Sequence, residues 1–323
     1  MKYSIVTPIY NSFASMQYYF ETLKHIPIDV EILLVDDCST DNTFDQLCEY
    51  QKTSNLNIHV LRTPSNGGPG VARNVGMHHA HGDWIVFLDS DDSLQRGFFE
   101  KLDALIMERN PDCIIYDSEL YDQHNRLLPK VKKSVYGKKE GFLSVTDAIA
   151  FAIPGVRKCF KRELLQNGRI TFSNLRRGED FLFYTMLFSS NPQMVIYYTE
   201  QKLYQIHQRE GSLSRNTRSD NIMPAIFDYL LTNVAEEYSG AIEIASVRLY
   251  LYGGLLILLS NGTSGKAVRS YINEYEKAYP KWYGSIGMTV LGKNKVIFLV
   301  LAKCRFVPLM RVYVALHKFL TTR

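Results

Sequence analysis

Hydrophobic and polar positions alternate in regular blocks along the first third of the chain. Five short apolar runs, rich in β-branched residues, are typical of buried strands. They are Ser4–Thr7, Ile32–Val35, Ile58–Leu61, Trp84–Leu88 and Cys113–Tyr116. Helical patterns lie between them, over residues 14–24, 42–52, 70–80 and 96–109. Strands that alternate with helices in this way predict an α/β fold with a mostly parallel, twisted sheet flanked by helices.

In the rest of the chain the pattern of hydrophobic and polar residues changes twice. Residues 119–178 are less regular, and they are followed by a predicted helix over 179–189 and strands near 194–205. Beyond them the pattern becomes helical, through Asn221–Glu237, Ile242–Leu259 and Lys266–Tyr279. We therefore predict a sheet-containing domain over residues 1–218 and a helical C-terminal region over residues 219–323.

The end of the chain is predicted to be amphipathic. The apolar run Val296–Ala302 has seven residues, whereas a membrane-spanning helix needs roughly 20. After Pro308, Arg311 and Lys318 fall on one helical face, and the other face carries Val312, Leu316, Phe319 and Leu320. Such a helix can lie in a membrane interface or pack on the domain, and both interpretations remain open. No acidic residue follows Glu276, so this basic tail favours an anionic surface such as phospholipid headgroups.

The composition argues against several classes of protein. The 323 residues are 46% hydrophobic and 22% charged, which is typical of a globular fold. A net charge of +4 gives no support for nucleic-acid binding. Five scattered cysteines without a Cys-x-x-Cys pair argue against a disulfide framework and against structural zinc. A strand pattern begins directly after Met1, so we expect no secretory signal and a cytoplasmic protein, peripheral at the inner face of the membrane.

Candidate chemistry lies at the predicted carboxyl ends of the strands, where open α/β sheets bind ligands. Asp89, Ser90 and Asp91 follow the fourth apolar run. The two carboxylates can place oxygens on a divalent cation, Mg²⁺ or Mn²⁺, and on a ribose hydroxyl. The same acidic residues can instead cap the helix that follows, and that alternative remains open.

Two further polar segments follow the second and third runs. Asp37 ends the second run and is assigned a ligand role, whereas Thr40 and Asp41 are suited to capping the next helix. The segment Asn66–Gly76 contains glycines that permit a tight turn, and Arg73 lies one helical turn in, within reach of an anion. The segment is neither a Walker loop nor a dinucleotide fingerprint, which argues against a Rossmann dehydrogenase.

Four segments now stand in a defined order along the chain: Thr7–Asn11, Val35–Ser39, Asn66–Gly76 and Phe87–Asp92. Together they resemble the family 2 inverting glycosyltransferases of the GT-A fold. The resemblance covers residues 3–118, and the later segment Arg177–Phe181 resembles the Glu-Asp motif that supplies the general base in this family. The sequence departs from the family pattern at Cys38, where relatives usually carry glycine.

The resemblance implies a donor site, a metal and a catalytic base. A nucleotide diphosphate-sugar, with uridine as the expected nucleotide, would contact residues from the four ordered segments, together with Arg209 further along the chain. They are Pro8, Tyr10, Asn11, Asp37, Asn66, Gly67, Arg73, Asp89, Ser90 and Arg209. A Mn²⁺ or Mg²⁺ ion would be held by Asp91 and Asp89. Asp180 would be the general base, and Glu179 would orient the acceptor or the base.

The implied reaction is metal-dependent transfer of a sugar, with inversion, to a hydroxyl of a glycan or polyprenyl-linked saccharide in surface polysaccharide synthesis. A nucleotidyltransferase shares this kind of sheet, but it needs a basic, glycine-rich triphosphate loop where residues 7–15 offer Pro, Tyr, Asn and Ser. An inactive paralogue would keep the pocket without any need for Asp37, Asp91 and Asp180 together. For His207, packing is favoured over contact with the phosphates.

Overall fold

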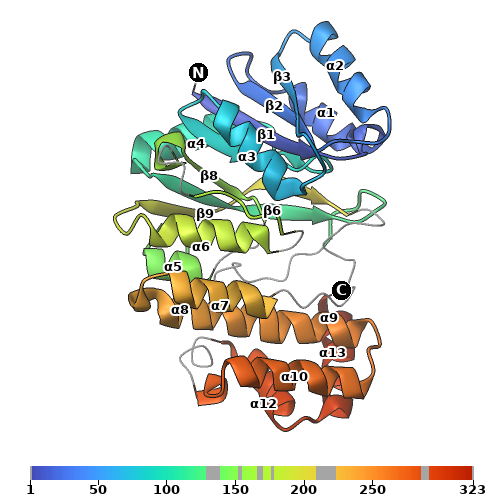
Figure 1. Cartoon of the computed structure of the whole chain (residues 1–323), viewed down its shortest axis with the longest axis vertical. Coiled ribbons are helices and arrows are strands. Elements are labelled where there is room, and N and C mark those ends of the chain that lie inside the picture. The colour runs from blue at the N-terminus through green and yellow to red at the C-terminus, as the bar shows by residue number, and fades with distance from the viewer. Residues whose placement is uncertain are drawn as a thin grey trace. The chain divides into compact units, whose positions relative to one another are not determined.

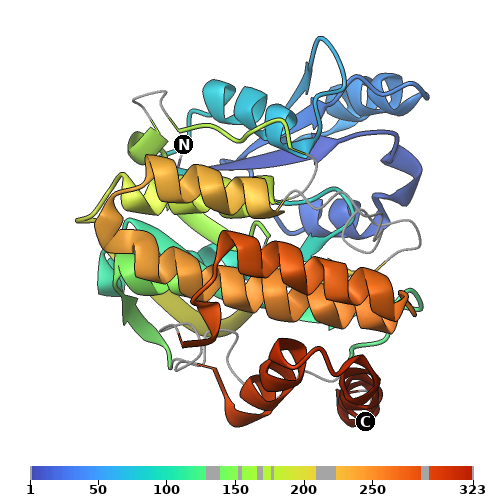
Figure 2. The same ribbon diagram turned by 60° about the horizontal axis from the view of Figure 1, so that its bottom comes forward.

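The computed structural model of the chain describes residues 2–128, 139–151, 155–165, 170–175, 178–208, 223–284 and 291–321. It divides into two compact units (Figure 1, Figure 2). In these ranges the sheet unit comprises residues 2–128, 139–145 and 155–208, and the helical unit comprises 146–151, 223–284 and 291–321. The predicted boundary between residues 218 and 219 falls in the stretch 209–222, outside the described residues.

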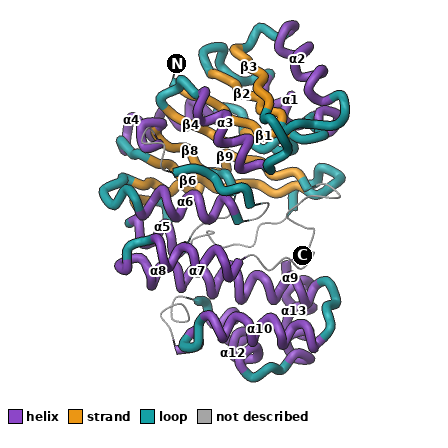
Figure 3. The backbone as a smooth tube through the Cα atoms, viewed as in Figure 1, coloured by secondary structure: helices purple, strands orange, loops and turns teal. Residues whose placement is uncertain are grey.

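The first four strands of the sheet unit are all parallel and lie in the order β3-β2-β1-β4 (Figure 3). Their bounds are β1 Tyr3–Ile9, β2 Glu31–Asp36, β3 Asn57–Arg62 and β4 Trp84–Phe87. Strands β1, β2 and β4 are buried along their whole length, which is why each appears as a continuous apolar run. Ile5, Ile32 and Val86 lie in register across them and are fully buried.

The four helices expected between the five apolar runs are present. They are α1 Gln17–Leu23, α2 Thr43–Thr53, α3 Pro69–His79 and α4 Phe98–Arg109. Helix α3 crosses β1 and β2 in Figure 1, and it begins after Gly68, whose φ of 88° lies in the left-handed region. Further along the helix, a Cβ on Gly76 would come within 2.3 Å of Val6 Cγ1. This close approach fixes α3, and therefore Arg73, against the sheet.

Beyond β4 the sheet becomes mixed. Strands β6 (Cys113–Tyr121) and β9 (Ile196–His207) run parallel, and β8 (Lys158–Lys161) inserts antiparallel between β4 and β6. Short strands β5 (Ser93–Leu94) and β7 (Gly141–Leu143) pair antiparallel with β9. The nine-stranded sheet formed by the described residues confirms the predicted α/β fold. Strand β8 was not expected, because four residues with a lysine at each end form no apolar run.

Helix α6 (Glu179–Ser189) has its predicted bounds and packs through aromatic side chains. The rings of Phe172 and Phe183 stack with their centroids 3.9 Å apart, and Phe87 of β4 meets both edge-on. Such aromatic pairs contribute about 0.5–1.5 kcal/mol each beyond the area they bury. The first turn of α6 is therefore fixed beside the end of β4.

The helical unit contains the helices expected at the C-terminal end, together with α5. The bounds are α5 Val145–Ala150, α7 Met223–Asn233, α8 Ser239–Ala245, α9 Gly254–Ser260, α10 Gly265–Ala278, α12 Lys293–Lys303 and α13 Val307–Thr321. A π-helical segment, Ser246–Gly253, joins α8 to α9. Helix α10 lies alongside this long helix in Figure 2, and Tyr271 Oη donates to the carbonyl of Tyr250 at 2.7 Å. Short 3₁₀ turns occur at Phe13–Ser15, Arg162–Leu165, Glu236–Tyr238 and Trp282–Gly284.

Two apolar helical surfaces are relevant to whether the chain contacts or crosses a membrane. By length and composition, Glu236–Ser260 is the one helix in the described part of the chain that could cross a bilayer. However, 56% of its most apolar 18-residue stretch is buried, which is typical of a core helix. In α13, Met310 and Val314 are buried, so this helix packs on its own unit. Its outer face carries Leu309, Val312 and Leu316, which are 47%, 55% and 57% exposed. Helix α13 is thus docked, and contact with a membrane stays a prediction.

Candidate active site

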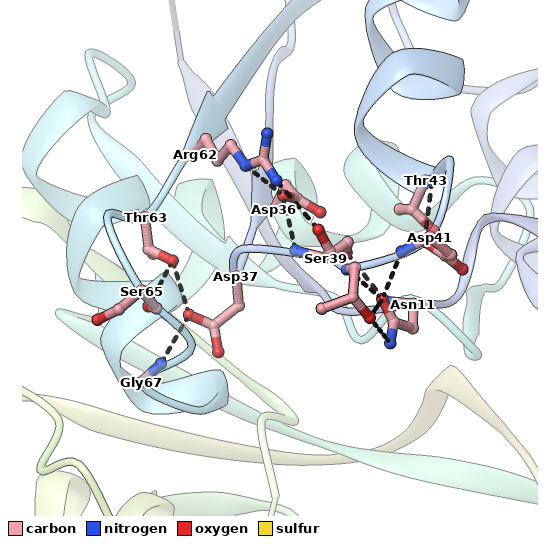
Figure 4. A network of polar contacts seen from close by, with 11 residues as sticks. Asn11, Asp36, Asp37, Ser39, Asp41, Thr43, Arg62, Thr63, Ser65 and Gly67 are labelled. Carbon is pink, nitrogen blue, oxygen red and sulfur yellow. Dashed lines mark hydrogen bonds and ion pairs between the residues drawn. The ribbon is translucent and has the colours of Figure 1, made fainter.

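The carboxylate of Asp37 follows the end of β2 and is held by the loop that precedes α3 (Figure 4). Its Oδ1 accepts hydrogen bonds from Thr63 Oγ1 at 2.8 Å and from Gly67 N at 3.1 Å. Its Oδ2 accepts from Gly68 N at 2.7 Å. A carboxylate has about four acceptor positions, so three are used here and one remains for a ligand. Asp37 therefore fixes the glycine loop, and its predicted role in donor binding stays a prediction.

The loops after β1 and β2 are tied together by Asn11 (Figure 4). Its Oδ1 accepts from Thr40 N at 2.8 Å, and its backbone N donates to Ser39 Oγ at 2.9 Å. Its φ of 45° is left-handed, a conformation that asparagine tolerates better than most residues. Beside it, the ring of Tyr10 is 43% exposed. Asn11 thus shapes the loop, and Tyr10 presents a ring on which a base can stack.

Cys38 occupies the position where the sequence departs from the family pattern. Its φ is 58°, in the left-handed region that glycine adopts freely. For other residues this conformation costs roughly 1–2 kcal/mol. The turn after β2 therefore keeps a glycine-like geometry in spite of the cysteine.

The remaining donor residues predicted from the sequence differ in accessibility. Pro8 is buried within β1. Ser90 is also buried, with its Oγ 3.4 Å from Ser12 Oγ. Asn66 is exposed in the loop before α3. Arg209 lies outside the described residues. Of the three that are placed, Asn66 offers its side chain directly to solvent.

Arg73 joins Asp89 to Glu179, which lies 106 residues after Arg73 in the chain. Its Nη1 donates to Glu179 Oε1 at 3.1 Å, and its Nη2 donates to Asp89 Oδ1 at 2.8 Å. The guanidinium is buried over the rings of Phe87 and Phe172. Burial works to lower the pKa of Arg73, but the two carboxylates outweigh it and the pKa is raised, so the side chain is a permanent cation. Arg73 therefore brings the predicted donor motif and the predicted acceptor motif into one site.

Glu179 and Asp180 form the first turn of α6. Glu179 is buried, and burial followed by the charge of Asp180 raises its pKa against the opposing effect of Arg73. Asp180 is half-buried, and its two oxygens accept from the backbone N–H groups of Gly155 and Phe181. A carboxylate in the first turn of a helix is also favoured by the helix dipole. Asp180 is thus oriented and remains partly accessible, as a base that meets an acceptor must be.

The carboxylates of Asp89 and Asp91 are the candidate metal ligands. Arg73 occupies Oδ1 of Asp89, whose side chain is 33% exposed, and Asp91 is also partly exposed. Within the ranges that the structure describes, no group of three or more His, Cys, Asp or Glu side chains is placed to hold a metal ion. Magnesium is usually bound through one or two carboxylates plus substrate phosphates. The residues present therefore fit a cation that arrives with a diphosphate.

His207 is a packing residue, as favoured from the sequence. Its ring stacks between Tyr18 and Tyr121, with centroid distances of 3.7 and 5.0 Å, and its Nε2 lies 2.8 Å from Ser93 Oγ. Burial lowers the pKa of His207 to about 4, so the ring is neutral at pH 7. The ring also lines a pocket of about 370 Å³ that contains none of the predicted site residues. The candidate site is defined by the polar network around Arg73 rather than by this pocket.

No pattern in the sequence indicated Lys158 as a residue of the site. This residue begins β8 and is fully buried, with its Nζ 3.0 Å from the carbonyl oxygen of Gly155. Its ammonium lies 3.9 Å from the centroid of the Tyr184 ring. The apolar pair Cys159 and Phe160 was the local signal for a strand, but it does not indicate whether the flanking lysines are buried.

The chain matches the family model described as glycosyl transferase family 2 over residues 4–168, which is half of its length. With the fold and the order of the motifs, this match defines the class. The chain belongs to glycosyl transferase family 2.

Several curated proteins are similar to the chain. It is 27% identical over 315 residues to the poly(ribitol-phosphate) beta-N-acetylglucosaminyltransferase TarS of Staphylococcus aureus, covering 94% of this chain and 52% of TarS. It is 30% identical over 215 residues to a poly(ribitol-phosphate) beta-glucosyltransferase of Bacillus spizizenii, covering 65% and 33%. It is 33% identical over 183 residues to the putative teichuronic acid biosynthesis glycosyltransferase TuaG of Bacillus subtilis, covering 55% and 68%. The chain thus spans about half or less of the length of the first two relatives.

Solved structures of TarS share the fold. The crystal structure of S. aureus TarS 1–349 in complex with UDP-GlcNAc has a TM-score of 0.68 and 22% sequence identity, covering 98% of this chain and 92% of that chain. The complex with UDP has a TM-score of 0.65 and 21% identity, covering 98% and 91%. The GT-A fold expected from the sequence is therefore confirmed.

Proposed function

We propose that the chain transfers a sugar from a nucleotide diphosphate-sugar to a hydroxyl of a glycan or polyprenyl-linked saccharide, with inversion, in the synthesis of a cell-surface polymer. The Arg73 bridge is the observation that carries this proposal, because one buried cation contacts both Asp89 and Glu179. A donor and an acceptor that react must be held together in one geometry, and the bridge supports a common site for them. The complexes of TarS with UDP-GlcNAc and UDP support a uridine nucleotide.

Donor binding is assigned to the ends of β1 and β2 and to the loop before α3. The exposed ring of Tyr10 stacks on the base. The remaining acceptor position on Asp37 suits a base N–H or a ribose hydroxyl. Asn66 and Gly67 are assigned to the same donor site, because Asp37 holds their loop through Gly67 and Gly68.

The metal assignment follows from Asp89 and Asp91. These carboxylates would hold Mn²⁺ or Mg²⁺, and the ion would neutralise the charge that builds on the diphosphate leaving group. Arg73 orients Asp89 by occupying its Oδ1. The partly exposed remainder of Asp89 and the side chain of Asp91 then face the ligand.

Asp180 is assigned as the general base. One of its oxygens takes the proton from the acceptor hydroxyl, whose oxygen forms the new bond to the anomeric carbon. The bond from that carbon to the diphosphate breaks on the opposite face, and the leaving group keeps the electron pair, which inverts the anomeric centre. General-base assistance of this kind contributes about 10²–10⁴-fold in rate. Glu179, fixed by Arg73, orients the acceptor beside the base.

A donor screen tests this function. The protein is incubated with a panel of nucleotide-sugars and Mn²⁺, with and without a wall-polymer extract as acceptor, and release of nucleoside diphosphate is measured. Titration calorimetry with UDP is carried out in parallel, with and without Mn²⁺. We expect turnover of a UDP-sugar and metal-dependent UDP binding that is lost in Asp91→Asn. UDP binding without turnover of any donor would indicate an inactive paralogue, and release of pyrophosphate from a nucleoside triphosphate would indicate a nucleotidyltransferase.

We also propose that the protein works in the cytoplasm at the inner face of the membrane, with α13 as the contact. The exposed stripe of Leu309, Val312 and Leu316 and the lack of acidic residues after Glu276 support this proposal. Co-sedimentation with vesicles tests it. We expect binding to anionic but not to zwitterionic phospholipid, and weaker binding by Val312→Glu. The control is Met107→Glu, on a residue of α4 that is 87% exposed. Equal loss in both variants would contradict the assignment to α13.

A further inference from the structure

A fully buried lysine lies behind the candidate base. Lys158 has no exposed surface, and it donates to the carbonyl of Gly155 at 3.0 Å. Its ammonium lies 3.9 Å from the centre of the Tyr184 ring. Tyr184 lies one turn after Asp180 in α6, so the lysine faces the same end of that helix as the base.

Gly155 connects this lysine to the base. Its carbonyl accepts from Lys158, and its N–H donates to Oδ2 of Asp180. The φ of Gly155 is 88°, a left-handed conformation that a side chain would strain. The two polar groups of one residue therefore link the ammonium to the carboxylate, and a lysine that holds the carbonyl also steadies the N–H that orients Asp180.

A buried ammonium needs compensation. Burial lowers the pKa of Lys158 to about 7, while Asp180 works to raise it, Arg157 lowers it and Cys113 raises it. An apolar side chain of similar size fills such a space with no cost of desolvation, and replacing buried charges in this way is often neutral or stabilising. A side chain with a pKa of about 7 carries its charge below pH 7, the range in which a carboxylate takes up its proton. A charge kept at this buried position therefore indicates a use for it.

We propose that Lys158 is a positioning residue for Asp180. Through Gly155 its ammonium holds the carboxylate in the orientation that a general base requires, and its positive charge acts near that carboxylate. The inference rests on the proposed function, in which Asp180 is that base. In the transfer step the proton passes from the acceptor hydroxyl to Asp180, and Lys158 neither gives nor takes a proton.

The charged and titratable groups near Asp180 come from several elements. Glu179 and Tyr184 are on α6, Lys158 is on β8, and Arg73 of α3 acts on the neighbouring Glu179. Removal of the Lys158 charge leaves the negative charge of Glu179 beside the base with less compensation. Loss of activity on acidification is then expected to begin at a higher pH.

Three variants test the role of the charge. Lys158→Met keeps most of the length of the side chain and removes the charge, and Lys158→Arg keeps the charge. The control is Lys161→Met, because Lys161 is on the same strand and pairs instead with Asp112 at 2.8 Å. In Lys158→Met we expect kcat to fall by about tenfold or more. The acid limb of the pH profile of kcat/KM should move up by about one pH unit or more, and UDP affinity should be unchanged. Lys158→Arg is expected to restore the acid limb, and the control to match the wild type.

An unchanged acid limb in Lys158→Met would overturn the inference even if kcat fell, because a purely structural residue does not change the pH at which the base is protonated. A second measurement does not depend on transfer. Urea unfolding midpoints are compared for the wild type, Lys158→Met, Asp180→Asn and the double variant. We expect midpoint shifts that do not add, and additive shifts would reject the pairing. A wild type that transfers no sugar but shows non-additive shifts would reject the proposed function while retaining the pairing of Lys158 with Asp180.

Discussion

Asp37 and Asp180, two carboxylates assigned to the candidate site, are held in different ways. The carboxylate of Asp37 is 2% exposed and accepts from three neutral donors, all in the loop that leads to α3. Asp180 is half-buried and accepts from two backbone N–H groups, with the buried ammonium of Lys158 behind it. Neutral donors fix the position of a carboxylate, whereas a nearby cation also favours its ionised form.

This difference separates a residue that shapes the site from a residue that reacts in it. A shaping carboxylate needs a fixed position, and its hydrogen bonds hold the surrounding backbone in return. A reacting carboxylate needs a fixed position, a suitable charge and access to the acceptor. Substitution of Asp37 is therefore expected to affect stability and donor binding, and substitution of Asp180 to affect turnover.

The largest effect is expected for Asp180→Asn. An amide cannot take up the proton, so kcat should fall by at least about 100-fold, while UDP affinity is retained because Asp180 is assigned to the acceptor side. Steady-state kinetics and titration calorimetry measure the two quantities. The control is Asp45→Asn, on an exposed carboxylate in the first turn of α2. Near-normal turnover in Asp180→Asn would contradict the assignment of Asp180 as the general base.

Arg73→Met should break the link between the donor motif and the acceptor motif. It leaves Asp89 and Glu179 without their shared cation, and loss of one partner of a buried ion pair costs about 3–5 kcal/mol. We expect the free energy of unfolding in urea to fall by that amount. The control is Arg126→Met, because Arg126 is 74% exposed and pairs with Asp122 at the surface, where such pairs contribute about 0–1 kcal/mol. Similar losses in both variants would show that the bridge does not stabilise the unit.

Asp37→Asn tests the shaping role. The amide group replaces one acceptor oxygen and leaves at least one N–H of the glycine loop unpaired, at a cost of about 1–3 kcal/mol. Urea unfolding should show this loss, and UDP affinity should fall with it. Asp41→Asn is the control, because Asp41 is exposed, contacts Thr43 N and can be replaced by asparagine as a cap. Full stability in Asp37→Asn would mean that the loop does not depend on this carboxylate.

The smallest effect is expected for Cys38→Gly, and it is a gain. Relief of about 1–2 kcal/mol of left-handed strain is partly offset by the greater chain entropy of glycine. The free energy of unfolding should rise by about 0.5–1 kcal/mol. Cys48→Gly, within α2, should lower it by a similar amount. A decrease in Cys38→Gly would show that the thiol makes contacts that outweigh the strain.

The parts of the fold that follow from local pattern could be predicted from the sequence. Strands β1, β2 and β4 are buried on both faces, so their sequences show their position directly. Gly68 and Pro69 mark the start of α3, where the structure has it. Strand β8 could not be predicted, because it is short and its burial is provided by neighbouring strands and by α6 rather than by its own residues.

The sequence names candidate residues for the site, and their roles stay predictions, whereas the contacts between them could not be predicted. Arg73 was expected near an anion, and the structure supplies two carboxylates from the protein itself. No local pattern links residue 73 to residue 179, and only the family resemblance placed them together. Lys158 was missed for the same reason, since the partners that make its burial tolerable come from other segments. The metal role of Asp91 stays a prediction.

The Arg73 bridge also limits how the chain can be divided. The stretch that defines the family, residues 4–168, contains the guanidinium and one of its carboxylates but ends before Glu179 supplies the other. A fragment cut after residue 168 would keep most of the sheet and would still have to bury a cation with half of its counter-charge. Truncation experiments that aim for an independently folding half should therefore extend at least through α6.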